Sequence, residues 1–300
     1  MPPQVHAPIV LLALVGLVIG FVAGMFGVGG GFLLTPVLIS LMGVPAPIAV
    51  GSALSQKCGT SIASFLKYRK FKRGEPRIDL VMIGGSVLGV DAGTRLLAHL
   101  SSRGHVVVRG HSLPLVEVVL DLLFIVLLSA TTFYVARDAW RASGRATPRG
   151  DRTIPGPLVT RVRIPPYIDL PNVGLSRVSV PMMCYLGFIL GAASGLMGIG
   201  GGVLFMPILL YGFGLSMKNA AGTGVLLLFC TVAVGTIEQA LRGYVSLPLS
   251  MSILLGSSIG TQLGALTTHY LPNRTLRMLF AVLVFATVVM IAFDLLRQLA

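Results

Sequence analysis

Stretches of about 20 apolar residues recur along the whole chain, and they constrain its fold more than any other feature. Each is long enough to cross the hydrocarbon core of a membrane, where only helices and closed barrels satisfy their own backbone hydrogen bonds. Charged residues make up only 11% of the chain, against about 25% in soluble domains. The sequence therefore predicts an all-α polytopic membrane protein. The predicted membrane segments are residues 8–26, 46–66, 78–100, 114–135, 181–197, 218–241, 247–271 and 275–296.

Most basic residues lie in two loops, which accounts for the net charge of +13 without a nucleic-acid partner. One loop is short and contains Lys67, Arg69, Lys70, Lys72, Arg73 and Arg77. The other is the segment 136–180, which is rich in arginine and proline. Basic residues concentrated beside membrane segments mark cytoplasmic loops, so both loops are predicted to be cytoplasmic in a multi-pass protein of the cell membrane.

A glycine-rich motif occurs twice. "GMFGVGGGFLLTP" begins at Gly24 and "GLMGIGGGVLFMP" begins at Gly195, and seven of the thirteen positions are identical. The same shift of 171 residues aligns further glycines in both halves of the chain. Two similar membrane halves joined by a linker are typical of transporters built from internal repeats. We therefore expect a first transmembrane repeat at 1–135, a cytoplasmic Arg/Pro-rich linker at 136–180 with an extended or loosely ordered chain, and a second transmembrane repeat at 181–300. Part of the linker, "RIPPYIDLPNVG", is less polar and is expected to pack on the cytoplasmic face.

Each motif predicts a glycine-broken helix at membrane depth. The apolar pieces that follow, residues 32–43 and 203–213, are too short to span a membrane alone, so a half-helix is expected to begin near Phe32 and near Val203. The unpaired N–H groups at such a helix start favour an anion. The predicted backbone ligands are Gly27, Gly29, Gly30, Gly31, Gly198, Gly200, Gly201 and Gly202. Close helix packing is the alternative interpretation for these runs, and an equally good one for Gly20, Gly85, Gly89, Gly256 and Gly260.

Two topologies fit this pattern. If the short pieces count as passes, each half has five passes, the repeats are inverted, and the amino terminus lies outside. If each glycine break belongs to a single crossing, each half has four passes and the repeats are parallel. The distribution of basic residues favours inverted repeats.

Ionisable residues inside apolar segments are costly, so each is a functional candidate. Lys57 and Arg95 are the candidate substrate-binding cations, and Glu238 and Asp91 are the candidate proton-coupling acids. Glu238 is the better proton carrier of the two, because Asp91 lies four residues from Arg95 and can pair with it. The alternatives are that Asp91 and Arg95 only pair with each other, and that Lys57 extends to the cytoplasmic surface.

The doubled motif, Gly-x-Gly-Gly-Gly followed by an apolar half-helix and proline, resembles the sulfite exporter TauE/SafE family. The resemblance covers nearly the whole chain outside 136–180. It implies a membrane permease for small sulfur compounds such as sulfite or sulfonates, often exported. The resemblance does not identify the anion. The only site residues that it implies are those of the two glycine motifs.

The sequence therefore predicts a secondary transporter that exports a small sulfur-containing anion. A channel-like pore for an anion or a neutral solute is the alternative, and a membrane enzyme or accessory subunit is a third class. No enzyme activity, cofactor or metal site is expected, because no metal cluster or nucleophile–base set occurs, and Cys58, Cys184 and Cys230 lie singly in apolar segments. The expected partners are the anion and membrane lipid, and a homodimer is allowed.

Overall fold

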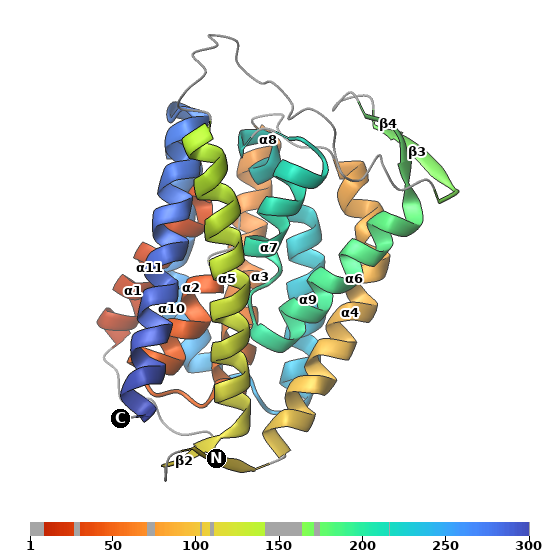
Figure 1. Ribbon diagram of the computed structural model, residues 1–300. Coiled ribbons are helices and arrows are strands. Elements are labelled where there is room, and N and C mark those ends of the chain that lie inside the picture. Colours follow the sequence, from red (N-terminus) through yellow and green to blue (C-terminus); the bar gives the residue numbers. More distant parts are fainter. Residues whose placement is uncertain are drawn as a thin grey trace.

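The computed structural model describes residues 9–26, 31–70, 76–102, 104–108, 111–141, 164–170, 175–215 and 217–299. These residues form a bundle of long helices with small hairpins at its two ends (Figure 1). Five of the described helices are long and apolar enough to cross a membrane. Large apolar side chains such as Leu88, Val126, Leu255 and Phe293 are exposed on the outside of the bundle, as expected for a surface that faces lipid. The all-α polytopic prediction is confirmed at this level.

The N-terminal half begins with α1 (Ile9–Phe26), which ends just before the first glycine run. Its other helices are α2 (Gly31–Pro36), η1 (Val37–Leu41), α3 (Ala46–Lys70), α4 (Pro76–Ser102) and α5 (Leu115–Arg141). Strands β1 (His105–Val108) and β2 (His111–Pro114) form an antiparallel hairpin between α4 and α5. α2 runs directly into η1, which has π-helical geometry, and the two form one short apolar helix.

The C-terminal half follows a second hairpin, β3 (Tyr167–Leu170) and β4 (Leu175–Ser179). Its helices are α6 (Val180–Met197), α7 (Gly202–Pro207), η5 (Ile208–Gly212), α8 (Met217–Gly222), α9 (Val225–Leu241), α10 (Leu247–Tyr270) and α11 (Asn273–Leu299). The predicted single segment 218–241 is wrong, because Gly224 adopts a left-handed conformation that separates α8 from α9.

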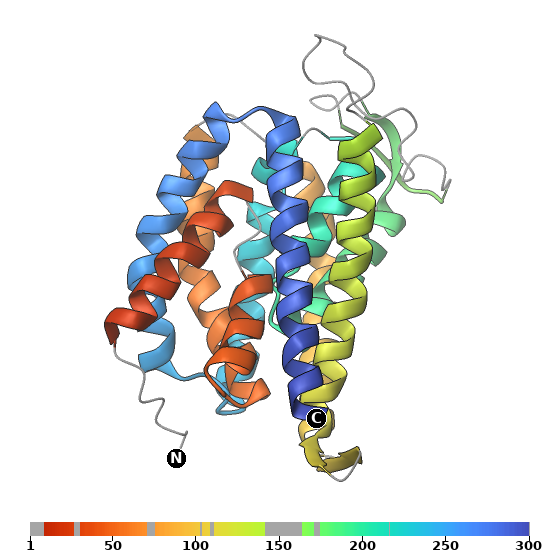
Figure 2. The same cartoon turned by 60° about the vertical axis from the view of Figure 1, so that its left-hand side comes forward.

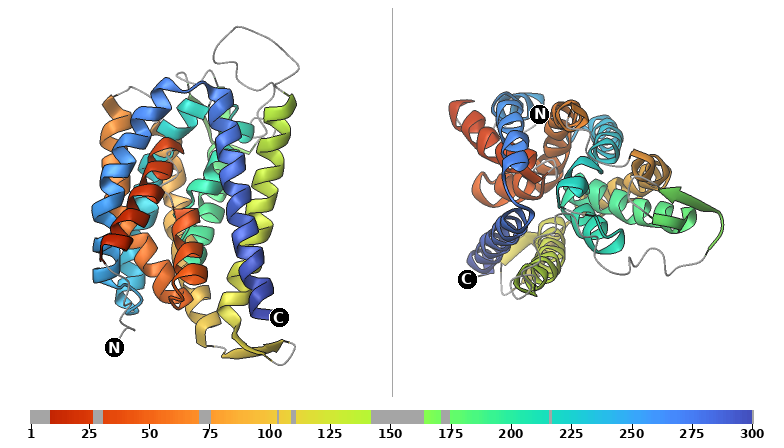
Figure 3. Two further views of the ribbon diagram at one scale, coloured as in Figure 1. Left: turned by 90° about the vertical axis from the view of Figure 1, so that its left-hand side faces the viewer. Right: turned by 90° about the horizontal axis from the view of Figure 1, so that it is seen from above.

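Corresponding helices of the two halves run in opposite directions (Figures 1 and 2). In Figure 1, α1, α3 and α5 rise towards the end of the bundle where β3 and β4 lie, whereas α6, α9 and α11 descend from it. α4 descends and α10 rises, and the breaks after α1 and α6 both fall within the height of the bundle (Figure 3).

Two helix pairs make the most extensive contacts, α1 with α10 and α4 with α6. Glycines at intervals of four line both sides of each contact: Gly16, Gly20 and Gly24 on α1, Gly256, Gly260 and Gly264 on α10, Gly85, Gly89 and Gly93 on α4, and Gly187, Gly191 and Gly195 on α6. A Cβ atom at any of these positions would overlap a backbone carbonyl of the partner helix. Small residues let membrane helices approach this closely, so the packing interpretation is confirmed for Gly20, Gly85, Gly89, Gly256 and Gly260.

The linker has more structure than its composition predicts. α5 continues to Arg141, and the strands β3 and β4 form a hairpin directly before α6. Leu170 and Val178 of this hairpin are buried, and Ser179 donates a hydrogen bond to the carbonyl of Ile164. This hairpin begins within the less polar stretch that is expected to pack on the cytoplasmic face, whereas residues 142–163 lie outside the described chain.

α3 differs from the other long helices because much of its buried surface is polar. Its buried polar side chains are Ser52, Gln56, Lys57, Thr60, Ser61 and Ser64. α3 contacts α2, α9 and α10, and Gln56 donates a hydrogen bond of 2.6 Å to Ser257 of α10. Membrane-buried polar groups need partners within the protein, so the polar side chains of α3 make the interior of the bundle a candidate location for a functional site.

Candidate functional site

The second glycine run forms a true break in the helix. α6 ends at Met197, and Gly198, Gly200 and Gly201 all have positive φ angles, of 68°, 69° and 78°. L-residues rarely adopt this conformation, which explains why glycine occupies these positions. The helix resumes at Gly202 and continues through α7 and η5 to Gly212.

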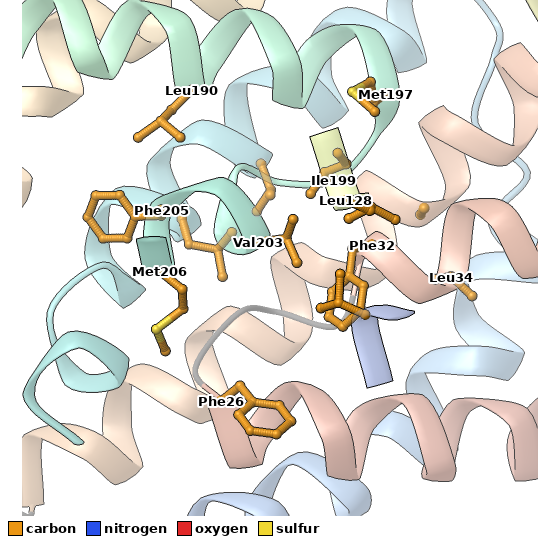
Figure 4. Close-up of a cluster of buried hydrophobic side chains, with 14 of the residues drawn as sticks. Phe26, Phe32, Leu34, Leu128, Leu190, Met197, Ile199, Val203, Phe205 and Met206 are labelled. Carbon is orange, nitrogen blue, oxygen red and sulfur yellow. The ribbon is translucent and has the colours of Figure 1, made fainter. Parts of the chain in front are cut away.

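The first glycine run lies mostly outside the described residues. Gly27, Gly29 and Gly30 are not described, and Gly31 is the first residue of α2. The helix that follows nevertheless reaches the second break, because Thr35 of α2 donates a hydrogen bond of 3.4 Å to the carbonyl of Gly198. α2 also contacts α7. In Figure 4, Phe32 of α2 lies close to Ile199 and Val203.

Lys57 of α3 enters this site from the other half of the chain. Its side chain is completely buried, and its Nζ atom donates a hydrogen bond to the carbonyl of Gly198. The alternative that Lys57 extends to the membrane surface is therefore wrong. Lys57 makes no ion pair with any residue that the structure describes. A buried ammonium without a carboxylate is a cation that a bound anion could neutralise.

Gly200 lies between Lys57 and Leu228, two residues that the shift of 171 places at equivalent positions. A Cβ on Gly200 would lie 2.9 Å from Cδ1 of Leu228 and 3.2 Å from Cδ of Lys57. The two equivalent side chains therefore flank the same glycine, but only one of them carries charge.

The cavity at this break is very small. Its volume is about 10 Å³, and its lining includes Gly200, Gly201, Phe205, Gly224 and Leu228. A space of this size holds at most one water molecule. An anion can therefore enter only if side chains such as Phe205 and Leu228 move.

Asp79 is a buried acid that the sequence analysis did not single out. Its side chain is buried at the start of α4, and its carboxylate accepts hydrogen bonds of 3.1 and 3.4 Å from the backbone N–H of Gly224. The carboxylate thus caps the N-terminus of α9, where a negative charge is favourable. The sequence signal is weak, because a lone aspartate near a predicted segment end is common and the break at Gly224 was not predicted.

The structure does not bring Arg95 to the glycine break. The Arg95 side chain is 73% exposed, and its Nε atom lies 2.8 Å from Oδ1 of Asp91. The alternative that these two residues pair with each other, four residues apart on α4, is what the structure shows. A mostly exposed pair of this kind contributes little to stability.

Glu238 is partly buried near the end of α9 and has two partners. It accepts a hydrogen bond from the hydroxyl of Thr94 on α4, and Nη1 of Arg242 lies 3.4 Å from Oε2. This ion pair weakens the reason for preferring Glu238 to Asp91 as a proton carrier, because both acids have a basic partner. No His, Cys, Asp or Glu cluster suited to a metal occurs among the described residues.

An apolar groove of about 710 Å³ lies between α1, α2, η1 and α11. Its lining is apolar except for Thr287, and it includes Leu14, Val18, Leu33 and Met290. Such a lining offers nothing to hold an anion, so the groove does not compete with the glycine break as a substrate site.

Comparisons with known proteins indicate a membrane transporter. The family model for the sulfite exporter TauE/SafE matches residues 12–291. The chain is 24% identical to the probable membrane transporter protein YunE of Bacillus subtilis, over 91% of this chain and 93% of that protein. It is 25% identical to a probable membrane transporter protein of Methanocaldococcus jannaschii, over 90% of each chain, and 26% identical to one of Xylella fastidiosa, over 91% of each chain. No solved structure matches the chain significantly.

Proposed function

Because the chain belongs to the sulfite exporter TauE/SafE family, we propose that it is a secondary transporter that exports a small sulfur-containing anion, such as sulfite or an organosulfonate. The relatives are named membrane transporters, and the helices suit a multi-pass membrane protein. The proposal adds the chemical class of the substrate, the binding site and the direction of transport.

The observation that carries the proposal is the buried amine of Lys57 at the glycine break. In its protonated form, a group in a low-dielectric interior attracts an anion far more strongly than the same cation in water. The glycines around it bring backbone N–H groups within reach of a ligand, and the helix that begins at Gly202 adds a favourable dipole. Gly198, Gly200, Gly201 and Gly202 are therefore the proposed backbone ligands, and Lys57 is the proposed charged ligand.

We further propose that the two halves are inverted repeats and that the first glycine run contributes from the opposite side. Support comes from the opposite directions of corresponding helices and from the hydrogen bond between Thr35 and Gly198. In this arrangement α3 ends and α4 begins at the same end of the bundle as the hairpin β3–β4, consistent with a cell-membrane protein whose linker is cytoplasmic.

A screen of anions against purified protein tests the proposal. The full chain is reconstituted in liposomes, and the flux of sulfite, sulfate, thiosulfate, methanesulfonate and acetate is measured. We expect a sulfur anion to be carried with saturation kinetics, because a cavity of about 10 Å³ requires a conformational change for each anion that passes. Flux that stays linear with concentration would instead favour the pore.

Paired variants test the site itself. Lys57→Met removes the buried cation with little change of volume, whereas Arg297→Met removes an exposed cation at the end of α11. We expect Lys57→Met to weaken anion binding by roughly tenfold or more, the loss of one hydrogen bond to a charged group, while Arg297→Met leaves it unchanged. Thermal unfolding of both variants verifies that they are folded. Equal anion affinity in wild type and Lys57→Met would overturn the assignment of Lys57. In that case, the same measurement on Arg95→Met tests the other candidate cation.

A further inference from the structure

We propose that Lys57 binds a proton together with the anion and releases it when the anion leaves, so that the transporter moves the two together. This inference rests on the proposed function, since it needs an anion at the glycine break. It makes the proton the second substrate and assigns its carrier to a lysine rather than an acid.

No described carboxylate compensates the charge of a protonated Lys57. The side chain is completely buried, and the hydrogen bond to the Gly198 carbonyl is its one interaction among the described residues. A carbonyl dipole does not neutralise an ammonium. An isolated charge in the interior of a protein is so unfavourable that the group either loses its charge or acquires a partner of opposite charge.

The neighbouring acids are already engaged. The helices packed on α3 carry three described acids: Asp79, Asp91 and Glu238. Asp79 accepts from the N–H of Gly224, Asp91 pairs with Arg95, and Glu238 pairs with Thr94 and Arg242.

The other titratable groups on these helices carry no negative charge in their protonated forms. The neutral ones include Cys58 on α3, Cys184 and Tyr185 on α6, Cys230 on α9 and Tyr270 on α10, and the basic ones include Arg77, Arg95 and His99 on α4, Arg242 after α9, and Lys218 on α8. No residue that the structure describes therefore supplies a counter-charge for Lys57.

The protonated amine of Lys57 has more hydrogen-bond donors than its described surroundings have acceptors for it. An ammonium has three N–H groups, and one of them is used by the Gly198 carbonyl. The other two have no acceptor among the described residues. An oxyanion at the glycine break would accept them and supply the missing negative charge at once. Binding of the anion and binding of the proton are thus mutually favourable, which is a thermodynamic linkage.

The proton balance of one transport cycle is simple. As the anion enters, a proton from water on that side forms a bond to the lone pair of Nζ. As the anion leaves, the N–H bond breaks and the proton passes to water on the other side. A monoanion is then carried without net charge, so its flux does not respond to the membrane potential. A dianion is carried with one net negative charge.

Calorimetry of the full-length protein tests the proposal. Methanesulfonate and thiosulfate are the probes, because their own charge does not change near neutral pH. Heats of binding in two buffers with different ionisation enthalpies give the number of protons taken up for each anion bound. We expect uptake approaching one proton in the wild type. We expect none in Lys57→Arg, because a guanidinium stays protonated in proteins. Glu238→Gln removes the rival carrier and should leave the uptake unchanged.

The results separate the two proposals. Wild-type protein that binds either anion without proton uptake, or Glu238→Gln that loses the uptake, overturns the lysine assignment but leaves the anion transporter intact. Failure of every sulfur anion to bind overturns both. A second readout needs no variant: in liposomes with an imposed potential, methanesulfonate flux should be insensitive to voltage and thiosulfate flux sensitive. Methanesulfonate flux that follows the potential contradicts the proposal.

Discussion

Substitution of Gly200 by alanine tests the geometry of the break most directly. Gly200 combines a φ angle of 69° with close neighbours: a Cβ would lie 2.9 Å from Leu228, 2.9 Å from Val232 and 3.2 Å from Lys57. The left-handed conformation costs an L-residue about 1–2 kcal/mol. Overpacking against side chains costs about 1–3 kcal/mol more. We therefore expect Gly200→Ala to lower the free energy of unfolding by about 2–5 kcal/mol.

Substitutions at two other glycines separate the conformational cost from the packing cost. Gly43 has a φ of 62° with nothing within 4 Å of a Cβ, so Gly43→Ala carries only the conformational cost of about 1–2 kcal/mol. Gly84 lies within α4 with open space and an ordinary helical conformation, so Gly84→Ala should stabilise the protein by about 0.5–1 kcal/mol. The expected order of stability is Gly84→Ala, wild type, Gly43→Ala, Gly200→Ala.

Unfolding in mixed micelles, followed by circular dichroism, gives these free energies in one set of conditions. Anion flux in liposomes is measured in parallel, and Gly200→Ala should lose transport while a folded fraction remains. Equal stability of Gly200→Ala and Gly43→Ala would refute the reasoning about packing, because it would mean that Leu228 and Val232 yield freely. A Gly200→Ala protein as stable as wild type would refute the left-handed break itself.

Three further predictions concern other contacts. Asp79→Ala should destabilise the protein by about 1–3 kcal/mol, because it leaves the N–H of Gly224 without its acceptor. Asp79→Asn keeps an acceptor and should cost less. Equal losses of stability in micelle unfolding would contradict the capping role. Gly89→Ala should disrupt the contact of α4 with α6 and lower stability, seen as a reduced unfolding midpoint beside the gain expected for Gly84→Ala. Arg95→Ala should change stability by less than about 1 kcal/mol, because its pair with Asp91 is mostly exposed; a larger loss in the same assay would show that Arg95 has a structural role not visible here.

Much of the fold is predictable from the sequence because the membrane limits the options. Long apolar runs become helices, and the glycine run at 198–202 becomes a break because no other residue permits its backbone angles. The division of 218–241 at Gly224 was not predicted, because the residues that follow form one long apolar run and the break is stabilised by Asp79, which is far away in the sequence. Lys57 and Arg95 also look alike in sequence, since both interrupt apolar segments. Only the packing of α3 inside the bundle distinguishes the buried cation from the exposed one.

The glycine-lined contacts have a consequence for how the molecule can move. α1 packs against α10, and α4 packs against α6, through backbone contacts that leave no room for a side chain. Each of these two composite pairs joins one helix from the first half of the chain to one from the second. We therefore expect each of these composite pairs, and not either half of the sequence, to move as one rigid body. The halves exchange their first helices, so we expect a chain cut within 142–163 to yield two fragments that are each incomplete.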